Sequence, residues 1–266
     1  MSYIVKLADL PPKLESLDLI LDKIVEGDCL ELMRRMPSGV VDAVITDPPY
    51  NVGYHYETYT DSLKDEDYQE LLRQTIAPPS VVIHYPEDMF VVSLAIGELP
   101  EKCVAWVYNA NTPRQWRMVS WFGIEPDFSL VRQPYKNQLD ARIKKLVAAG
   151  SLGRSLYDWW DVQQVKNVSE EKTDHPCQIP LEVMENVVGV TPAKLIFDPF
   201  LGSGTTAVAA KKLGRHFIGC EINADYCKIA ERRLLELDAQ PKLFNPQEAV
   251  AEQRPLIAPA EAGWRE

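Results

Sequence analysis

Short apolar runs alternate with amphipathic segments along most of the chain. Runs rich in Val and Ile predict strands, and apolar residues spaced three or four positions apart predict helices. The strands are expected at residues 23–28, 40–46, 80–85, 102–108, 128–132, 194–200 and 216–221. The helices are expected at residues 29–36, 65–76, 87–96, 137–153, 180–188, 207–213 and 223–237. Strands that alternate with helices in this way indicate an α/β fold.

One predicted strand ends in a cluster of groups that could bind a ligand. The apolar run at residues 40–46 leads into Asp47-Pro48-Pro49-Tyr50, and the prolines force the chain to leave the sheet extended. Open α/β sheets bind ligands at such carboxyl ends. The Asp47 carboxylate and the Pro48 carbonyl could accept both N–H bonds of a planar amino group, and the Tyr50 ring could stack on a heterocycle. The tetrapeptide therefore predicts a pocket for the amino edge of adenine or cytosine; an ordinary proline turn is the alternative.

A second strand, at residues 194–200, leads into a glycine-rich turn. Gly202 and Gly204 would let the backbone approach a ligand, and the N–H groups at the helix start favour a carboxylate or phosphate. Glu221 ends the following strand, about where an acid holds ribose hydroxyls in nucleotide-binding units. The glycines also fit the G-x-G-x-x-A pattern of NAD enzymes. Only one helix and an irregular tail follow Glu221, however, so the other strands must come from earlier in the chain.

This order of segments predicts a specific topology. The sheet is expected to start near residue 23, and its cofactor-binding unit is contributed last. Asp47 and Gly204 should then lie at neighbouring strand ends. One strand end would hold a base and the other a ribose-bearing cofactor.

Composition narrows the class of protein. The 266 residues, 46% hydrophobic and 25% charged, fit one large globular domain with a modest insertion. Apolar runs stay below the roughly 18 residues of a membrane span, and the N-terminus lacks a signal pattern. A cytoplasmic protein without membrane contact is therefore expected. The five cysteines are widely spaced without a C-x-x-C pair, which argues against a disulfide framework and predicts no metal site.

The charge is unevenly distributed. The net charge of −11 is unfavourable for binding nucleic acid, but residues 114–154 carry eight basic against three acidic residues, a local charge of +5. Such a segment could bind a polyanion, and a solvated helix face is the alternative. The residues predicted to contact nucleic acid are Arg132, Lys136, Arg142, Lys144, Lys145 and Arg154.

The two motifs together resemble a known family. Residues 47–50 (Asp-Pro-Pro-Tyr) and 198–206 (Asp-Pro-Phe-Leu-Gly-Ser-Gly-Thr-Thr) are similar to the β-group of S-adenosylmethionine-dependent DNA amino-methyltransferases. In that group the catalytic motif precedes the cofactor motif. Residues 26–29 (Glu-Gly-Asp-Cys) and 175–180 (His-Pro-Cys-Gln-Ile-Pro) match two further family segments. The resemblance implies a doubly wound, Rossmann-like sheet that is circularly permuted and carries a short target-recognition insertion.

The resemblance also implies residue roles. Residues 47–50 would be catalytic, and S-adenosylmethionine would be the cofactor. The implied cofactor-binding residues are Asp28, Cys29, Asp47, His175, Gln178, Pro180, Asp198, Pro199, Phe200, Gly202, Ser203, Gly204, Thr205, Thr206 and Glu221. Cys177 and Ile179 depart from the commoner Thr and Lys, and the missing lysine could weaken cofactor or phosphate contacts.

The implied organisation places an N-terminal extension at residues 1–22 and the catalytic half at 23–135. A target-recognition segment would follow at 136–174, the cofactor-binding half at 175–238 and a tail at 239–266.

The implied activity is methylation of the N6 amino group of a flipped-out adenine in double-stranded DNA, as in restriction–modification systems. Adenine is expected because the Asp-Pro-Pro-Tyr form is commoner among the family's adenine enzymes. Cytosine N4 methylation and RNA adenine methylation remain alternatives, and a catalytically silent, cofactor-binding partner subunit is a further one. The acidic surface and the short recognition segment are compatible with a homodimer.

Overall fold

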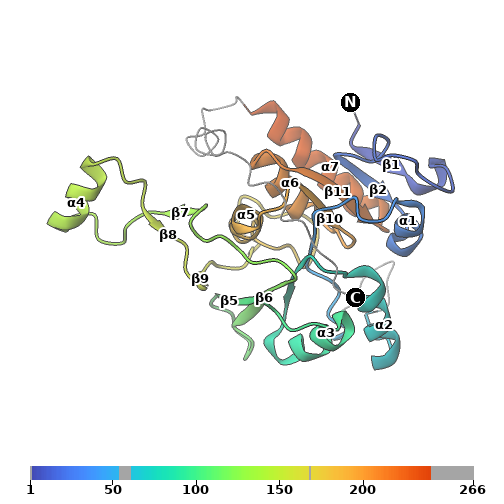
Figure 1. The fold of residues 1–266 in the computed structure, drawn as a ribbon, viewed down its shortest axis with the longest axis horizontal. Coiled ribbons are helices and arrows are strands. Elements are labelled where there is room, and N and C mark those ends of the chain that lie inside the picture. Colours follow the sequence, from blue (N-terminus) through green and yellow to red (C-terminus); the bar gives the residue numbers. More distant parts are fainter. Residues whose placement is uncertain (1, 54–60, 168, 241–266) are drawn as a thin grey trace, which may run out of the picture.

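A twisted β-sheet with helices on both faces forms the body of the molecule (Figure 1). The computed structural model describes residues 2–53, 61–167 and 169–240. In this part of the chain nine strands form one sheet in the order β1-β2-β11-β10-β3-β4-β6-β5-β9. They are β1 (Ile4–Lys6), β2 (Lys23–Glu26), β3 (Ala43–Thr46), β4 (Ser80–His84), β5 (Lys102–Val107), β6 (Trp116–Phe122), β9 (Trp159–Asp161), β10 (Leu195–Asp198) and β11 (His216–Glu221).

The helices follow the predicted alternation. They are α1 (Cys29–Arg35), α2 (Asp65–Thr75), α3 (Met89–Ile96), α4 (Ala141–Ala148), α5 (Leu181–Val190), α6 (Thr205–Lys212) and α7 (Ala224–Ala239). Short 3-10 helices cover Leu7–Asp9 and Pro86–Asp88. Side-chain caps set some of their starts: Asp28 accepts the Glu31 N–H before α1, and Asn223 accepts the Asp225 N–H before α7.

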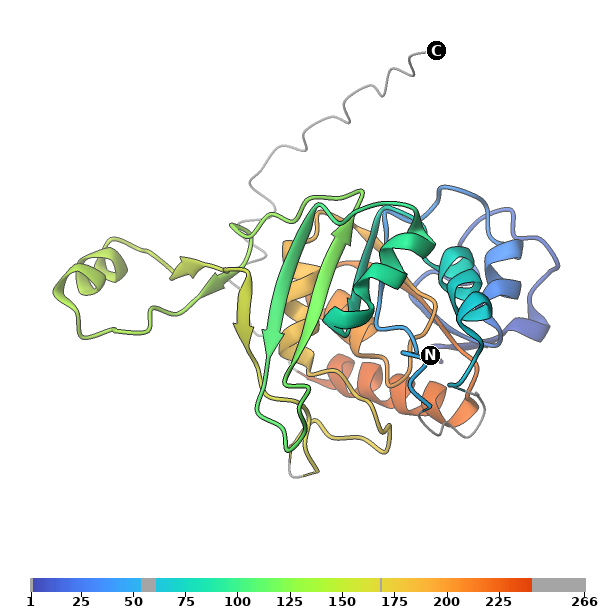
Figure 2. The ribbon, with the colours of Figure 1, turned by 90° about the horizontal axis from the view of Figure 1, so that it is seen from below.

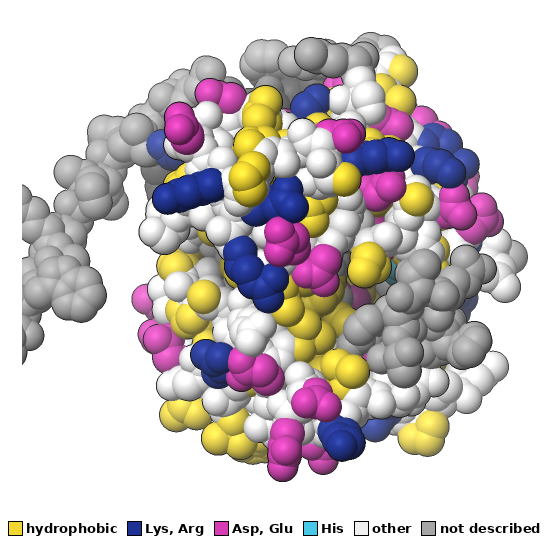
Figure 3. All heavy atoms as spheres, turned by 90° about the vertical axis from the view of Figure 1, so that its right-hand side faces the viewer, with side chains coloured by type: hydrophobic (Ala, Val, Ile, Leu, Met, Phe, Trp, Pro, Cys, Tyr) yellow, Lys and Arg dark blue, Asp and Glu magenta, His cyan; other side chains and the backbone are white. Residues whose placement is uncertain are grey.

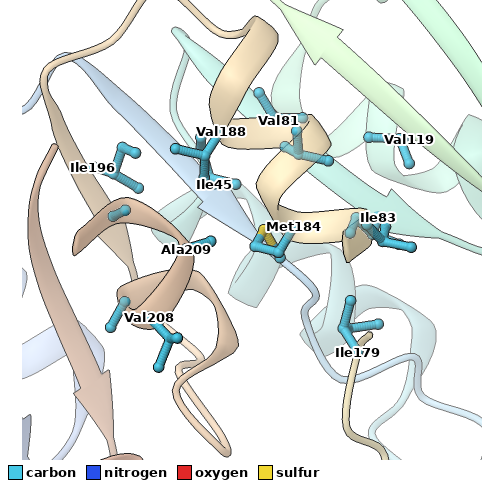
Figure 4. Packing of buried hydrophobic residues seen from close by; sticks show 14 of the residues in the cluster. Ile45, Val81, Ile83, Val119, Ile179, Met184, Val188, Ile196, Val208 and Ala209 are labelled. Carbon is cyan, nitrogen blue, oxygen red and sulfur yellow. The ribbon is translucent and has the colours of Figure 1, made fainter. Parts of the chain in front are cut away.

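Successive residues of each strand face opposite sides of the sheet, so the apolar side chains form one core layer on each face. Ile45, Val81 and Ile83 pack on one face against α5 and α6, where Met184 and Val188 meet them (Figure 4). Neighbouring residues on the same strands point to the other face and pack under α1, α2 and α3. Burial on both faces explains why these strands read as continuous apolar runs.

The predicted topology is confirmed at its centre. Strand β10 pairs in parallel with β3 on one side and with β11 on the other. The unit β10-α6-β11, which comes last in the chain, therefore lies beside the strand that leads to Asp47. The neighbouring strands of the sheet are parallel except for those paired with β6, which is antiparallel to both β4 and β5. The doubly wound α/β fold is thus confirmed.

The structure differs from the predicted elements in four details. The strand expected at residues 128–132 is absent, because the chain forms turns there and enters β7 (Arg132–Gln133) only at its end. The strand β6 was not predicted. The sheet starts at β1 and not near residue 23, since Ile4 pairs with Ile24. The helix expected at residues 137–153 covers only Ala141–Ala148, because Asp140 caps its start.

An arm projects from the body (Figures 1 and 2). Its base is a two-stranded antiparallel ribbon of β7 and β8 (Arg154–Ser155), and its tip is α4, which contains no buried residue. The predicted recognition segment, residues 136–174, comprises most of this arm, strand β9 and the chain that returns to the body. The predicted C-terminal tail lies outside the described residues from residue 241 onward.

Candidate active site and cofactor pocket

A cavity of about 240 Å³ opens where the central parallel strands end. Residues that follow β2, β11, β10 and β3 line it, which is where an open α/β sheet is expected to bind its ligand. The predicted site residues in its lining are Asp28, Cys29, Asp47, Pro48, Pro49, Tyr50, His175, Asp198, Pro199, Phe200, Gly202, Ser203, Thr205, Thr206 and Glu221.

Three predicted cofactor residues do not line this cavity. Gln178 supports the loop before α5, because its side chain accepts the Thr173 N–H and donates to the Glu171 carbonyl. Pro180 precedes the first turn of α5, and Gly204 precedes the first turn of α6. These residues shape the backbone that surrounds the cavity.

Asp47 is placed at the end of β3 with its carboxylate between two partners. Its Oδ1 atom accepts a hydrogen bond from the Tyr50 hydroxyl, and its Oδ2 atom lies 3.7 Å from Nη1 of Arg117. The side chain is 18% exposed. Burial raises the pKa of Asp47 to about 6, while the Arg117 charge and the Tyr50 hydrogen bond act in the opposite direction.

Aromatic residues fix the backbone around Asp47. The Tyr68 hydroxyl donates to the Pro49 carbonyl at 2.8 Å and lies 2.9 Å from Nε2 of His84. The Tyr68 hydroxyl thus links the Pro49 backbone to the His84 ring. Burial lowers the pKa of His84 to about 4, so this imidazole is neutral.

The Tyr50 ring lies in the same aromatic group. Its centroid is 4.3 Å from that of His84 and 4.8 Å from that of Tyr85, which meets it edge-on. Tyr50 and Tyr85 both line the cavity. The predicted stacking surface is therefore beside the predicted amine acceptor.

The glycine turn after β10 is held from two directions. The Glu221 carboxylate accepts the Gly202 N–H and the Asn223 N–H, each at 2.8 Å. Arg233 of α7 donates to the Ser203 carbonyl at 2.8 Å and to the Thr205 hydroxyl at 2.9 Å. The turn is thereby fixed to both β11 and α7.

Hydrogen bonds also join the two strand ends that carry the motifs. Thr46 donates to Asp198 Oδ1 at 2.8 Å, and the Phe200 N–H donates to the same atom at 3.0 Å. Burial raises the pKa of Asp198 to about 6. Asp47 and the glycine turn are therefore held in a fixed relation by the Thr46–Asp198 contact.

His175 closes the other side of the glycine turn. Its ring packs edge-on against Tyr226 with centroids 4.5 Å apart, and burial lowers its pKa to about 4. A Cβ atom on Gly202 would lie 2.9 Å from His175 Nε2. The Nδ1 atom of His175 is buried without a partner among the described residues.

The cavity fits a nucleoside-bearing cofactor. Two carboxylates, the buried Asp198 and the half-buried Glu221, supply acceptors, and the turn at Gly202 brings backbone close to the space. Phe200 and Ile222 give it apolar walls. Polar atoms at a few fixed points within a mainly apolar lining are typical of cofactor sites.

Several residues of the site were not predicted from the sequence. Arg117, Tyr85 and Tyr226 line the cavity, and Arg233 supports the glycine turn. None belongs to a recognisable spacing pattern. Arg117 lies between Trp116 and Met118 in β6, and because this strand was not predicted, the position of the arginine within it gave no signal.

The six basic residues predicted to bind nucleic acid lie on the arm. Arg132 and Arg154 are on its ribbon, Lys136 follows β7, and Arg142, Lys144 and Lys145 are exposed on α4. On the face at the right of Figure 1, by contrast, basic and acidic side chains are interspersed (Figure 3). The local positive charge therefore belongs to the arm.

Two further features, a metal-binding cluster and a membrane-spanning helix, are absent from the part of the chain that the structure describes. Within residues 2–53, 61–167 and 169–240, no group of three or more His, Cys, Asp or Glu side chains could hold a metal ion. No helix in those same ranges is long and apolar enough to cross a membrane. The five cysteines are free thiols.

Comparisons with known proteins agree with this geometry. The DNA methylase family model for N6 and N4 methyltransferases matches residues 80–232. The Type II methyltransferase M.ScaI of Streptomyces caespitosus is 31% identical over 86% of this chain and 85% of its own. The Type II methyltransferase M.BglII of Bacillus subtilis is 30% identical over 79% of this chain and 68% of its own. The DNA adenine methyltransferase YhdJ of Escherichia coli (strain K12) is 24% identical over 79% of this chain and 82% of its own.

Solved structures share the fold. PvuII DNA methyltransferase, described as cytosine-N4-specific, superposes with a TM-score of 0.57 at 16% identity, over 86% of this chain and 90% of its own. The M1.HpyAVI–SAM complex gives 0.51 at 23% identity, over 79% and 98%.

The fold and the cavity thus define a Rossmann-like nucleotide-binding protein. More specifically, the chain belongs to the N6/N4 DNA methylase family, whose members are S-adenosylmethionine-dependent amino-methyltransferases. The family and cofactor predictions are confirmed.

Proposed function

We propose that this protein transfers a methyl group from S-adenosylmethionine to the N6 amino group of adenine in double-stranded DNA. The observation that carries the proposal is the common cavity of Asp47 and the glycine turn, at the ends of the paired strands β3 and β10. S-adenosylmethionine supplies an activated methyl group on its sulfonium. The protein therefore contributes mainly positioning and electrostatics.

Asp47 and Pro48 are the proposed acceptors for the amino group. A target base would leave the duplex, at a cost of a few kcal/mol, and rest against the Tyr50 ring. Hydrogen bonds from the amine to the Asp47 carboxylate and the Pro48 carbonyl would turn the nitrogen lone pair toward the glycine turn. The Tyr50 hydroxyl occupies one lone pair of Asp47 Oδ1, so the amine would donate to Oδ2 or to the remaining lone pair of Oδ1.

The cofactor would be held by residues from several strand ends. We assign Glu221 to the ribose hydroxyls, since each carboxylate oxygen that accepts one backbone N–H keeps a second lone pair. Asp28 and Cys29 would lie on the adenine side. Asp198 and the turn at residues 202–206 would surround the methionine part.

Adenine N6 is preferred over cytosine N4 on the strength of the Asp-Pro-Pro-Tyr motif. YhdJ, which is similar over most of its length, is described as a DNA adenine methyltransferase. PvuII methyltransferase, which shares the fold, is described as cytosine-N4-specific. Cytosine N4 is therefore the second candidate product.

The deciding experiment measures tritiated methyl transfer from S-adenosylmethionine onto double-stranded DNA, with RNA as the matched alternative substrate. Hydrolysis of labelled DNA and chromatography of the bases would show N6-methyladenine. Label in N4-methylcytosine would replace the adenine assignment, and label in RNA alone would replace DNA as the substrate. Cofactor binding without transfer to either would support a silent partner subunit.

The activity should depend on the ionisation of Asp47. A protonated carboxyl group loses one of its acceptor sites, so the rate should fall as the pH drops through the pKa of Asp47, about 6. We expect kcat/KM for DNA to reach half its plateau near pH 6 and to be nearly constant above about pH 7.5. Rates that stay at the plateau down to pH 4.5 would contradict this role for Asp47.

The arm should contribute most of the electrostatic affinity for DNA. Changing Arg142, Lys144 and Lys145 to Gln should weaken DNA binding about tenfold or more at moderate salt. The slope of log K against log salt concentration should become shallower by roughly 0.9 for each phosphate contact that is lost. Binding of S-adenosylmethionine should be unchanged. The control changes Lys6, Lys13 and Lys64 on the body to Gln, removing the same charge. Equal losses in both variants would show a net-charge effect and contradict a role for the arm.

A homodimer is also proposed. Sedimentation of the protein with and without DNA tests it.

A further inference from the structure

Arg117 is a charged residue in a buried position of β6. It is 9% exposed and lies among aromatic rings. Its guanidinium carbon is 5.1 Å from the centroid of Tyr50, 5.6 Å from that of Tyr85 and 5.3 Å from that of Trp106. These distances are within the range of cation–π contacts.

Stability alone does not account for this arginine. Burying a guanidinium costs several kcal/mol unless it is well paired and hydrogen-bonded. The Arg117–Asp47 separation of 3.7 Å exceeds hydrogen-bond distance. The guanidinium hydrogen-bonds the Tyr108 side chain, but its Nε atom has no partner among the described residues. An apolar side chain would fill this part of the core at a lower cost.

The position of Arg117 relates it to the reaction site. Strand β6 lies beyond β4 on the side of β3 opposite β10. The guanidinium therefore reaches Asp47 from the side away from the glycine turn. Because its contact is a charge at 3.7 Å and not a hydrogen bond, the lone pairs of Asp47 Oδ2 stay available.

We propose that Arg117 is a positioning residue for methyl transfer, holding the Asp47 carboxylate and the Tyr50 ring in the arrangement that receives the amino group of the target base. The consequence for catalysis rests on the function proposed above. The effect of Arg117 on the ionisation of Asp47 does not depend on that function.

The charges around Asp47 support this role. Among the groups that lower the pKa of Asp47 against burial, the Arg117 charge is the largest. The Asp47 charge contributes to the raised pKa of Asp198 on β10, for which burial is the main cause. The other groups facing this corner are His84 on β4, whose pKa burial lowers to about 4, the phenols of Tyr50 and Tyr108, whose pKa burial raises, and the Tyr85 ring with Arg114 stacked on it. The Arg114 charge acts on His84 and is not among the causes that shift the pKa of Asp47. Arg117 is thus the main stabiliser of the ionised carboxylate.

The test compares Arg117→Gln and Arg117→Lys with the wild-type protein. The control is Arg114→Gln, because Arg114 lies 4.3 Å above the same Tyr85 ring but forms no ion pair with Asp47 among the described residues. Carboxyl ¹³C resonances of aspartates are titrated in the protein without DNA or cofactor, and Asp47→Asn identifies the Asp47 signal. Thermal unfolding verifies that each variant is folded.

We expect the titration midpoint of Asp47 to rise by about 1–3 pH units in Arg117→Gln, less in Arg117→Lys, and not in Arg114→Gln. The acid limb of the methyl-transfer profile should move by the same amount, with activity partly recovered at high pH. An unchanged Asp47 midpoint in folded Arg117→Gln would overturn the proposal. An equal loss of rate at every pH would also overturn it, by assigning Arg117 a purely structural role. The titration needs no methyl transfer, so failure of the proposed function is distinguishable from failure of this proposal. In that case the wild-type protein would be inactive, but the Asp47 midpoint would still rise in Arg117→Gln.

Discussion

Asp47→Ala is expected to lower the rate of methyl transfer by about a thousandfold, the upper end of the range for losing one polar group aimed at a reacting atom. The variant removes both carboxylate oxygens from the end of β3. Pro48 then offers the target amine a single acceptor, and the lone pair of the nitrogen is no longer oriented. Affinity for S-adenosylmethionine should stay within about threefold, because hydrogen bonds from other residues hold the glycine turn.

The matched control is Asp42→Asn, at the opposite end of the same strand. Asp42 accepts the N–H groups of Lys194 and Leu195, each at 2.8 Å. Its replacement should lower the free energy of unfolding by about 1 kcal/mol and leave the rate unchanged. Tritium transfer at saturating DNA measures the rate, and calorimetric titration measures cofactor affinity. Full activity in Asp47→Ala would remove the catalytic assignment.

The centre of this fold could be predicted because its signals are local. Buried parallel strands read as apolar runs, and the residues that end them, Asp47 and Asp198, are followed by prolines and glycines that mark the turns. The order of the two motifs along the chain then implied that β3 and β10 are neighbours. Parallel pairing of Phe197 with Val44 bears this out.

The β5–β6 edge of the sheet could not be predicted in the same way. Strand β6 contains Arg117 between apolar and aromatic residues, so its alternation does not match a half-buried strand. Its pairing with β4 sets Met118 opposite His84. That register brings Arg117 to Asp47 across β4, and no local pattern encodes it. The residues that surround the predicted catalytic motif were therefore missed although the motif itself was found.

Glu221 shows a related limit. Its place at the end of β11 predicted a ribose ligand, and the structure adds that its carboxylate holds the Gly202 N–H. The two roles are compatible, since one carboxylate can accept about four hydrogen bonds. The sequence predicted where the acid lies but not that it holds the glycine turn.

Two glycines of the glycine turn should respond differently to replacement by alanine. Both have positive φ, 53° at Gly202 and 80° at Gly204, so alanine costs about 1–2 kcal/mol in backbone strain at either position. A Cβ atom on Gly204 would also lie 2.6 Å from Cβ and 2.9 Å from Cα of Ala230, in the backbone of α7. A Cβ atom on Gly202 would instead meet the His175 ring at the wall of the cavity.

Gly204→Ala should therefore lower the free energy of unfolding by about 2–5 kcal/mol, because α6 and α7 must separate, and lower Tm by roughly 5–15 °C. Gly202→Ala should lower Tm less but weaken S-adenosylmethionine binding at least about tenfold, since the displaced imidazole or the shifted turn narrows the cavity.

Gly214→Ala is the control for strain alone. Gly214 has φ of 68°, and a Cβ atom there would meet nothing within 4 Å. Calorimetry of the three variants, with and without S-adenosylmethionine, separates the effects. If Gly204→Ala is no less stable than Gly214→Ala, the close contact between α6 and α7 is not a constraint. If Gly202→Ala binds the cofactor with wild-type affinity, the turn is not part of the cofactor site, because a side chain at that position would have to enter the space assigned to it.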